Sequence, residues 1–400
     1  MRTASTQAEL RFLMSLVNDD GKRESTDALI NDIVRMIDEG HQREQIERQV
    51  KHRHFGLLFQ LARGRISARK RFTRWDRVYL DEYSSSFSTP PELPGMYRGG
   101  RRLQGGKSIA DIGCGAGMQA IFFSLGHCRV TAVEKDPLRY TLALLNSLAY
   151  RAKVDVVHSD YASLDPGRIE ADVVFSDPLR PREEGVRTMG TLLPSPLALM
   201  DFFGQRDYAF DLPPQMRWDN IPVDGGEKEY ISVDGGELNR LTLYTGSLAL
   251  SGSSAVMLPQ GRVIRGGDPG EVGGLEAIRE AGRYVYVPDP AVVHARLLHT
   301  VPGISDMRVL ESGPPRRLVL TSDTEYSGFP GKAYMRISGS SDMVERLREN
   351  NIGRVFVRFS SSPGGENYSE KMRIEREIRG EGTAYIFKDG SGPFAAVEIP

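Results

Sequence analysis

The fold of this chain is decided by residues 109–117, which read Ile-Ala-Asp-Ile-Gly-Cys-Gly-Ala-Gly. A short apolar run ends in an acid, three alternate glycines allow a tight turn, and helix-forming residues follow. Seventeen residues after Gly117, Glu134 closes a second apolar run at 130–133. A doubly wound α/β sheet uses this order of strand, glycine turn, helix and acid-ended strand to hold an adenosine-containing cofactor.

The residues around the glycines select the class of cofactor. The run is G-x-G-x-G with Asp111 before it, whereas a pyrophosphate site has G-x-G-x-x-G. A carboxylate repels a pyrophosphate but attracts a cationic sulfonium and an α-amino group, and an acid at the end of the second strand suits ribose hydroxyls. The pattern resembles motif I and the following acidic loop of class I S-adenosylmethionine (SAM)-dependent methyltransferases. The resemblance implies that Asp111, Gly113, Gly115 and Gly117 hold the methionine part of SAM and that Glu134 holds the ribose. The alternative is a glycine turn of an unrelated α/β protein or a dinucleotide site.

The segments that follow fit a parallel α/β sheet. Asp136 and Pro137 open a helix as its N-cap and first-turn proline, and runs 154–157 and 172–175 are predicted as the third and fourth strands. In methyltransferases an acid after the third strand commonly meets the adenine amino group. The resemblance therefore assigns the adenine contact to Asp160, and the alternative role of Asp160 is to cap a helix or a turn.

The end of the fourth strand limits the chemistry. Residues 177–180 read Asp-Pro-Leu-Arg, and ligands lie outside the carboxyl ends of parallel strands, so Asp177 is predicted to face the transferable methyl group and to orient the acceptor. Methyltransferases of exocyclic amines often carry an acid or Asn, two prolines and an aromatic ring; this tetrad keeps the acid and Pro178 only, which disfavours adenine N6. Arg180 and Arg182 are candidates for base or phosphate contacts, or are solvated loop charges. The candidate catalytic residues are Asp177, Pro178 and Arg180.

The two cysteines limit the chemistry further. Methylation of pyrimidine carbon 5 needs a cysteine nucleophile, but Cys114 lies inside the glycine turn and Cys128 lies just before the second strand. Neither is placed to attack a base, and the pair offers no disulfide framework and no zinc spacing. A ring nitrogen such as guanine N7 has a free lone pair, so it needs positioning but no strong base.

Charge is distributed unevenly along the chain. The net charge of all 400 residues is −1, but residues 41–77 hold eleven Lys or Arg and three Asp or Glu, which gives +8. Within this segment, cations alternate with Phe72 and Trp75. Cations meet phosphates and rings stack on bases, so the segment predicts contact with RNA, and the alternative is a basic solvated helix face. The candidate RNA-binding residues are Arg69, Lys70, Arg71, Arg74 and Arg77.

The pattern of apolar residues divides the chain into three parts. Residues 1–80 are predicted as an N-terminal helical basic domain. Residues 81–268 are predicted as the methyltransferase domain, in which 81–107 form a lead-in loop whose Tyr83 could cover the cofactor. Residues 280–400 are predicted as a small α+β domain. Further expected elements are a hairpin around Asp234-Gly235-Gly236, a last strand of the sheet domain at 255–259, a linker at 266–270, a helix at 288–298, a helix at 343–349 and a strand at 355–359.

A narrower resemblance covers most of the chain from about residue 75. The hairpin followed by residues 244–249, the strand at 256–259 and the segment 286–293 are similar to the THUMP-like methyltransferase family. The resemblance implies a Rossmann-like class I methyltransferase domain between an N-terminal helical region and a C-terminal THUMP-like α+β domain. It also implies an archaeal member of the family, SAM as the cofactor and tRNA as the substrate. The family's tetrad commonly continues as D-P-A-R-R, and residues 177–181 depart from that pattern in two places.

The sequence therefore predicts a SAM-dependent methyltransferase of a guanine in tRNA, with N7 favoured over the exocyclic N2. Residues 1–20 lack the apolar core of a signal peptide, and no run approaches the ~20 apolar residues that span a membrane, so we expect a cytoplasmic protein without a membrane partner. One alternative is a methyltransferase that acts on protein or a small molecule. Another is a non-catalytic RNA-binding protein on a methyltransferase scaffold.

Overall fold

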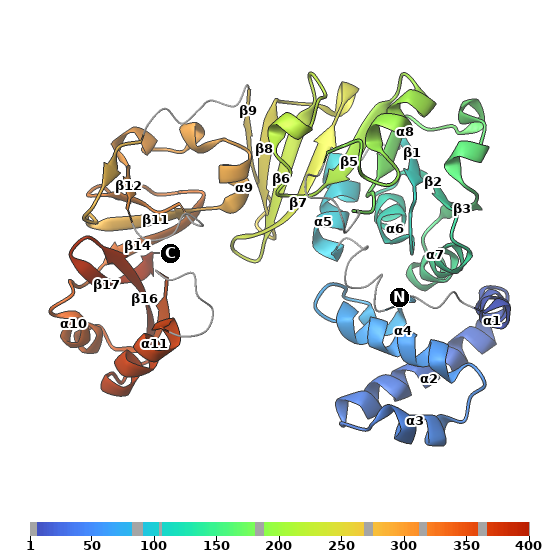
Figure 1. Ribbon diagram of the computed structural model, residues 1–400, viewed down its shortest axis with the longest axis horizontal. Helices are drawn as coiled ribbons and strands as arrows, with labels where there is room; N and C mark the ends of the chain where they lie inside the picture. The colour runs from blue at the N-terminus through green and yellow to red at the C-terminus, as the bar shows by residue number, and fades with distance from the viewer. Residues whose placement is uncertain are drawn as a thin grey trace. The chain divides into compact units, whose positions relative to one another are not determined.

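The computed structural model shows two compact units (Figure 1). The first contains Met1–Lys228 and Arg240–Leu250, and the second contains Glu229–Asn239 and Ser251–Pro400. Within them, the structure describes residues 6–81, 91–103, 106–180, 188–267, 275–311, 318–358 and 366–399. No helix in these described ranges is both long enough and apolar enough to cross a bilayer.

The sheet of the first unit has the strand order β3-β2-β1-β4-β5-β7. Strands β1 to β5 pair in parallel, and β7 runs antiparallel to β5. The order reverses between β1 and β4, and at such a switch point the carboxyl ends of the strands form a ligand crevice. The strands are β1 (Ser108–Ile112), β2 (Arg129–Glu134), β3 (Val154–His158), β4 (Val173–Ser176), β5 (Asp207–Leu212) and β7 (Glu237–Tyr244). The predicted parallel α/β sheet is confirmed.

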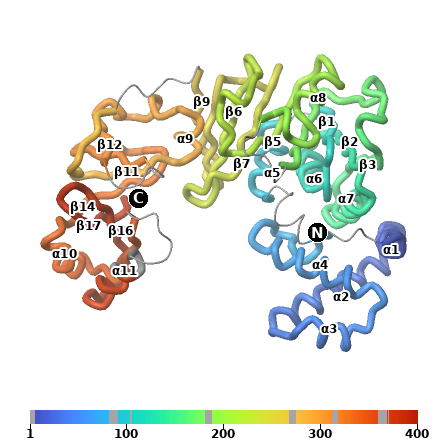
Figure 2. Tube along the Cα trace, viewed as in Figure 1, coloured from blue at the N-terminus to red at the C-terminus, as the bar shows by residue number. Residues whose placement is uncertain are grey.

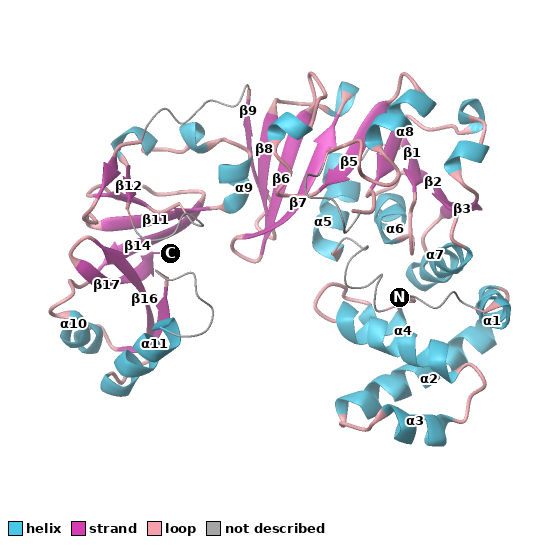
Figure 3. Cartoon of the chain, in the orientation of Figure 1, coloured by secondary structure: helices cyan, strands magenta, loops and turns pink. Residues whose placement is uncertain are grey.

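Helices α6 (Met118–Leu125), α7 (Pro137–Tyr150) and α8 (Pro196–Phe203) accompany this sheet (Figure 3). The predicted start of α7 is confirmed: the side chain of Asp136 accepts a hydrogen bond from the backbone N–H of Arg139 at 2.9 Å, and Pro137 occupies the first turn.

The expected lead-in loop is wrong for residues 92–102. They form α5 (Glu92–Tyr97) and a π-helical turn, Arg98–Arg102. Two of the glycines that suggested a loop are sites of close packing: a Cβ at Gly95 would lie 2.2 Å from the ring of Phe122 in α6, and a Cβ at Gly99 would lie 2.2 Å from the carbonyl oxygen of Phe122.

The N-terminal helices belong to the same compact unit as the sheet. They are α1 (Gln7–Val17), α2 (Asp20–Asp38), α3 (Arg43–Val50) and α4 (Phe55–Ala68). Leu58 and Phe72 share one buried core with Phe122 of α6 and Leu145 of α7. Asn146 of α7 strengthens the contact, because its side chain accepts from the backbone N–H of Tyr79 at 2.7 Å and donates to the carbonyl of Tyr79 at 3.1 Å. The helical region is therefore held against the sheet unit.

The second unit contains the tip of the predicted hairpin, with its turn at residues 234–236 (Figure 2). Strands β6 (Glu227–Val233) and β7 flank the turn, and β8 (Ser253–Met257) pairs antiparallel with β9 (Arg262–Gly266). The prediction that 255–259 is the last strand is therefore wrong. The expected linker at 266–270 overlaps β9 at Gly266, and its residues 268–270 lie outside the described residues. Exposed arginines in β9 masked its strand pattern, since a sheet edge tolerates charge.

The rest of the second unit is an eight-stranded sheet of order β10-β12-β13-β11-β14-β17-β16-β15. The predicted helix α10 (Met343–Glu349) is confirmed, while the helix expected over 288–298 is only α9 (Pro290–His294). Helix α11 is Glu366–Glu377. The strands are β10 (Ala277–Ile278), β11 (Tyr284–Pro288), β12 (Arg308–Leu310), β13 (Leu320–Ser322), β14 (Gly331–Arg336), β15 (Ile352–Val357), β16 (Gly382–Asp389) and β17 (Gly392–Ile399).

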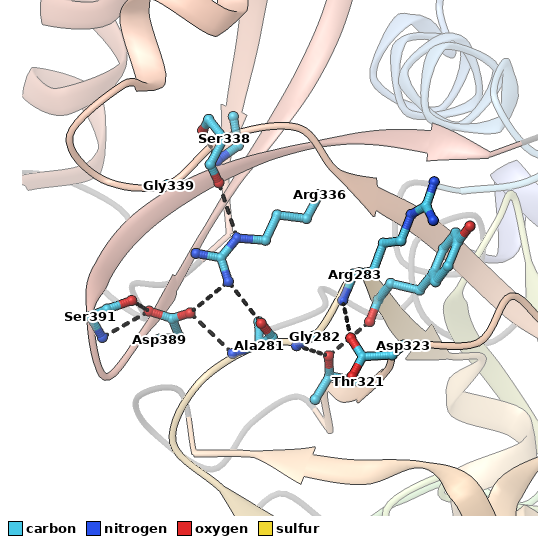
Figure 4. A network of polar contacts seen from close by, with 12 residues as sticks. Ala281, Gly282, Arg283, Thr321, Asp323, Arg336, Ser338, Gly339, Asp389 and Ser391 are labelled. Atoms are coloured by element: carbon cyan, nitrogen blue, oxygen red, sulfur yellow. Dashed lines mark hydrogen bonds and ion pairs between the residues drawn. The ribbon is translucent and has the colours of Figure 1, made fainter.

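A polar network fixes the β16–β17 turn of this sheet (Figure 4). Nη1 of Arg336 donates to the carbonyl of Ala281 at 2.7 Å and lies 3.3 Å from Oδ2 of Asp389. The same carboxylate accepts from the backbone N–H groups of Ala281 at 3.1 Å and Ser391 at 2.9 Å. Because these partners satisfy the hydrogen-bonding capacity of the Asp389 carboxylate, we assign the network a structural role.

Candidate active site

The glycine turn leaves β1 and enters α6 with three left-handed residues. Gly113, Gly115 and Gly117 have φ values of 74°, 59° and 78°, which disfavour any residue with a Cβ. At Gly117 a Cβ would lie 2.9 Å from the Cβ of Ala143 in α7, so this glycine is needed for helix packing. At Gly115 a Cβ would meet no described atom within 4 Å. The turn is therefore packed on its helix side and open at Gly115.

Glu134, at the carboxyl end of β2, fixes this turn. Its side chain is 5% exposed; Oε2 accepts the backbone N–H of Gly115 at 2.8 Å, and Oε1 accepts the backbone N–H of Asp136 at 2.8 Å. Each carboxylate oxygen has a further lone pair, so Glu134 can accept hydroxyl hydrogens while it holds the turn. The predicted ribose contact remains a prediction.

Asp111, near the carboxyl end of β1, is a buried acid with an unsatisfied oxygen. It is 2% exposed, and its Oδ2 has no hydrogen-bond partner among the described residues. Burial raises the pKa of Asp111 well above its usual value, and the charges of Asp177 and Glu134 raise it further. A buried carboxylate without a partner is costly, and a cationic ligand would relieve that cost. The site therefore fits the sulfonium and ammonium charges of SAM.

Beside these acids lies a buried ion pair that sequence reasoning missed. Arg98 and Asp211, the latter on β5, are both fully buried, and Nη2 of Arg98 lies 2.7 Å from Oδ1 of Asp211. Thr242 of β7 donates to the same oxygen at 2.7 Å, and Nη1 of Arg98 donates to Oε1 of Gln119 at 2.5 Å. Such a bonded pair fixes the relative positions of the π-helical turn, α6, β5 and β7.

Arg240, also on β7, connects this pair to the predicted methyl-transfer position. Its Nη1 lies 3.3 Å from Oδ2 of Asp177 and 3.9 Å from Oδ2 of Asp211. Burial raises the pKa of Asp177, and the positive charge of Arg240 opposes that rise. Pro178 is buried and Arg180 is exposed. The sequence did offer one sign of Arg240: it is a charged residue within the otherwise apolar run of β7.

Asp160 takes the capping role that was the alternative to its adenine contact. Its Oδ1 accepts from the backbone N–H of Ala162 at 3.1 Å, and Oδ2 lies 3.3 Å from Nζ of Lys135. The carboxyl is part-exposed at 41%, so it remains accessible to a ligand. The predicted contact with adenine is untested by these bonds.

The two rings of the basic segment are not arranged as expected. Phe72 is 3% exposed and stacks on Phe122 with ring centres 6.4 Å apart, so the interpretation of Phe72 as a base-stacking ring is wrong. The guanidinium of Arg69 covers the ring of Trp75 at 4.6 Å and pairs with Asp38 at 2.5 Å. Phe72 is therefore a core residue. Lys70, Arg74 and Arg77 are exposed.

Arg71 of this segment lies near enough to Arg240 and Asp177 for their charges to act on it. It is half-buried, and burial together with the charge of Arg240 lowers its pKa to about 10, while the charge of Asp177 opposes the shift. Arg71 therefore belongs to the surroundings of Asp177. Tyr83 and Arg182 lie outside the described residues.

Comparison with solved structures supports the fold. A putative methyltransferase from Porphyromonas gingivalis W83 matches with a TM-score of 0.63 and 16% identity, over 86% of this chain and 90% of that one. The Thermus thermophilus 16S rRNA N2 G1207 methyltransferase, in complex with AdoMet and guanosine, matches with a TM-score of 0.30 and 16% identity. The match covers 40% of this chain and 44% of that one. A methyltransferase from Pyrococcus furiosus matches with a TM-score of 0.29 and 24% identity, over 36% of this chain and 75% of that one. No protein-family profile matches the chain. The chain shares its fold with the P. gingivalis protein.

Proposed function

We propose that this protein is a SAM-dependent methyltransferase. The observation that carries the proposal is the unsatisfied, buried Oδ2 of Asp111, on the strand that leads into an open glycine turn held by Glu134, at the switch point of a parallel sheet. A pyrophosphate would be repelled by these two acids, whereas a cation is attracted. The shared fold with the P. gingivalis protein supports the same conclusion.

Each residue of the site has a role in this proposal. Asp111 binds the cationic methionine part, Gly115 lets the ligand approach the backbone, Glu134 accepts from the ribose hydroxyls and Asp160 accepts from the adenine amino group. SAM, when bound, supplies a methyl group on a sulfonium for direct displacement. Asp177 orients the acceptor in line with that methyl group, and alignment in a site that excludes water provides most of the acceleration.

We infer that the acceptor is a guanine of tRNA. Arg71, Arg180 and Arg240 all act electrostatically on or with Asp177, and arginines suit both the O6/N7 edge of guanine and phosphates. N7 is favoured over N2 because residues 177–180 lack the second proline and the ring of exocyclic-amine methyltransferases.

The test is to incubate the protein with radiolabelled SAM and unmodified tRNA, and to identify the labelled nucleoside by mass spectrometry. We expect 7-methylguanosine from the wild type and little label from Asp111→Ala or Glu134→Ala. Asp172→Ala is the matched control, because Asp172 only binds Ser108 at the other end of the sheet, through Oδ2 at 2.8 and 2.7 Å. Equal SAM affinity in wild type, Asp111→Ala and Glu134→Ala would refute the assignment of the cofactor site.

One observation favours a protein or small-molecule acceptor. Part of the +8 charge of the basic segment is neutralised by ion pairs within the protein: Arg65 is fully buried and paired with Asp27, and Arg69 is paired with Asp38. If labelled SAM is consumed with cell extract depleted of RNA, but not with tRNA, this second acceptor class is correct. Failure of calorimetry to detect SAM binding would instead favour a non-catalytic RNA-binding protein.

A further inference from the structure

Two leucines lie opposite each other at the carboxyl edge of the parallel strands in the first unit. Leu179 follows the end of β4, and an isolated antiparallel bridge joins it to Leu193. The backbone N–H of Leu179 donates to the carbonyl of Leu193 at 2.7 Å, and the N–H of Leu193 donates to the carbonyl of Leu179 at 3.0 Å. Residues that exchange both bonds project their side chains to the same side. We call Leu179 and Leu193 the leucine pair.

The leucine pair points into solvent while its neighbours in the chain point into the protein. Leu179 is 38% exposed and Leu193 is 61% exposed, whereas the preceding residues, Pro178 and Leu192, are buried. A single exposed leucine is ordinary on a protein surface. Two that lie opposite each other form a contiguous apolar patch, and such a patch beside a crevice is typical of a ligand site.

The segment that carries Leu193 is anchored on both sides of this residue. Met189 is fully buried, and its carbonyl accepts from the Oγ of Ser195 at 3.2 Å. The same Oγ accepts the backbone N–H of Ala198 at 3.3 Å and so caps the start of α8. These contacts, together with the bridge to Leu179, fix the exposed position of Leu193.

The leucine pair connects the two halves of the candidate active site. Pro194, next to Leu193, lies against the glycine turn, because a Cβ at Gly113 would be 3.6 Å from the Cδ of Pro194. Leu179 comes two residues after Asp177 in the chain. The pair therefore borders the cofactor turn on one side and Asp177 on the other. A methyl acceptor has to lie in this place, since it must reach both the methyl group and Asp177.

The groups around the leucine pair select the chemistry of its ligand. The patch itself is apolar, but the carboxylate of Asp177 lies beside it, and the exposed Arg180 acts electrostatically on that carboxylate. A nucleobase has apolar faces and a polar edge, so it can satisfy both parts of such a site. A lysine or glutamate side chain has no flat apolar face, and a phenylalanine ring has no polar edge.

We propose that the leucine pair contacts the flat face of an unpaired purine base, and that Leu179 and Leu193 thereby select an RNA base as the methyl acceptor. The ring lies against both leucines and turns its polar edge toward Asp177. Bases within a duplex already have both faces covered, so the RNA must present this base unpaired. The inference rests on the proposed function, because it assigns two specificity-determining residues to the same site.

The test is saturation-transfer NMR of guanosine 5′-monophosphate with the full-length protein, deuterated except at its leucine methyl groups. Irradiation of these methyl groups should saturate the H8 proton of guanine more strongly than the ribose protons. Leu179→Ser/Leu193→Ser should abolish this preference and weaken binding of the nucleotide about tenfold, because each buried methylene contributes a factor of about four to affinity. The same variant should keep the SAM affinity of wild type within about twofold.

Two further variants control for charge-free changes of shape and for a general loss of surface leucine. Leu179→Met/Leu193→Met keeps an apolar patch of similar volume and should bind the nucleotide within about twofold of wild type. Leu148→Ser is the matched control, because Leu148 is 41% exposed in the last turn of α7. That helix starts at the carboxyl end of β2 and returns to the other edge of the sheet, so Leu148→Ser should leave nucleotide binding unchanged.

Three results would overturn the inference. They are equal saturation of H8 in wild type and Leu179→Ser/Leu193→Ser, an affinity for the nucleotide no greater than that for ribose 5-phosphate, and tighter binding of N-acetylphenylalaninamide than of the nucleotide. The last result would indicate a protein acceptor. Calorimetry of SAM separates the inference from the proposed function: wild type that binds SAM without a preference for the base refutes the inference alone, and wild type that binds the base through the leucine pair but not SAM refutes the proposed methyl transfer.

Discussion

Replacing Asp111 by Asn should stabilise the ligand-free protein and weaken its binding of SAM. The side chain is 2% exposed, and Oδ2 has no partner among the described residues, so the folded state carries the cost of an unsatisfied buried acceptor. That cost is about 1–3 kcal/mol, and it is larger for a charged group. Asn has nearly the same shape as Asp and carries no charge. We therefore expect the free energy of unfolding of Asp111→Asn, measured in urea, to exceed that of wild type by about 1–3 kcal/mol.

The pH dependence of this difference has a definite sign. The pKa of Asp111 is raised in the folded state, mainly by burial, so the folded protein binds the proton more tightly than the unfolded chain. Wild type therefore loses stability as pH rises from the unfolded pKa of about 3.9 to the raised pKa of the folded state. Asp111→Asn lacks this loss. The advantage of the variant should grow with pH across that window and then remain constant.

The assay is urea unfolding followed by circular dichroism between pH 4.5 and 8, with calorimetry of SAM at pH 8. Loss of a hydrogen bond to a charged group should weaken SAM about 10- to 100-fold. Asp172→Asn is the matched control with the opposite sign: hydrogen bonds from Ser108 lower the pKa of Asp172, so this variant should lose stability and keep its SAM affinity. A less stable Asp111→Asn at pH 8, or one that binds SAM as wild type does, would refute the reasoning.

Three further changes test the buried framework. Arg98→Met leaves the Asp211 carboxylate buried without its partner and should lower the free energy of unfolding in urea by about 3–5 kcal/mol. The double variant Arg98→Met/Asp211→Leu should recover most of that loss. A double variant whose loss equals the sum of the two single losses would contradict this. Gly117→Ala places a Cβ 2.9 Å from the nearest side chain of α7 at a φ of 78° and should lower stability by about 1–3 kcal/mol; a variant as stable as wild type would show that the turn relaxes freely. Arg240→Met removes the charge that lowers the pKa of Asp177, so any rate that needs ionised Asp177 should show its acid limb at higher pH; an unmoved pH profile would exclude that role.

Local patterns in the sequence were sufficient for the central part of the fold. The apolar runs of β1 to β4, the alternate glycines, and the Asp136-Pro137 start of α7 all depend on neighbours a few residues apart. The helix at Glu92–Tyr97 could not be predicted from such patterns, because its Gly95 serves packing against α6 rather than a turn. Likewise, Phe72 alternates with cations in the sequence but belongs to the core between the helical region and α6.

The sequence by itself determined the cofactor side of the candidate site: Asp111, the three glycines and Glu134 lie on one strand–turn–helix–strand unit, so their spacing along the chain already sets their spacing in space. Only the tertiary structure decided the acceptor side. Arg98 and Asp211 are 113 residues apart in the chain, and Arg240 reaches Asp177 across 63 residues. Such pairs are formed by sheet order and by helix packing, and no local periodicity records which distant charge a buried charge will meet.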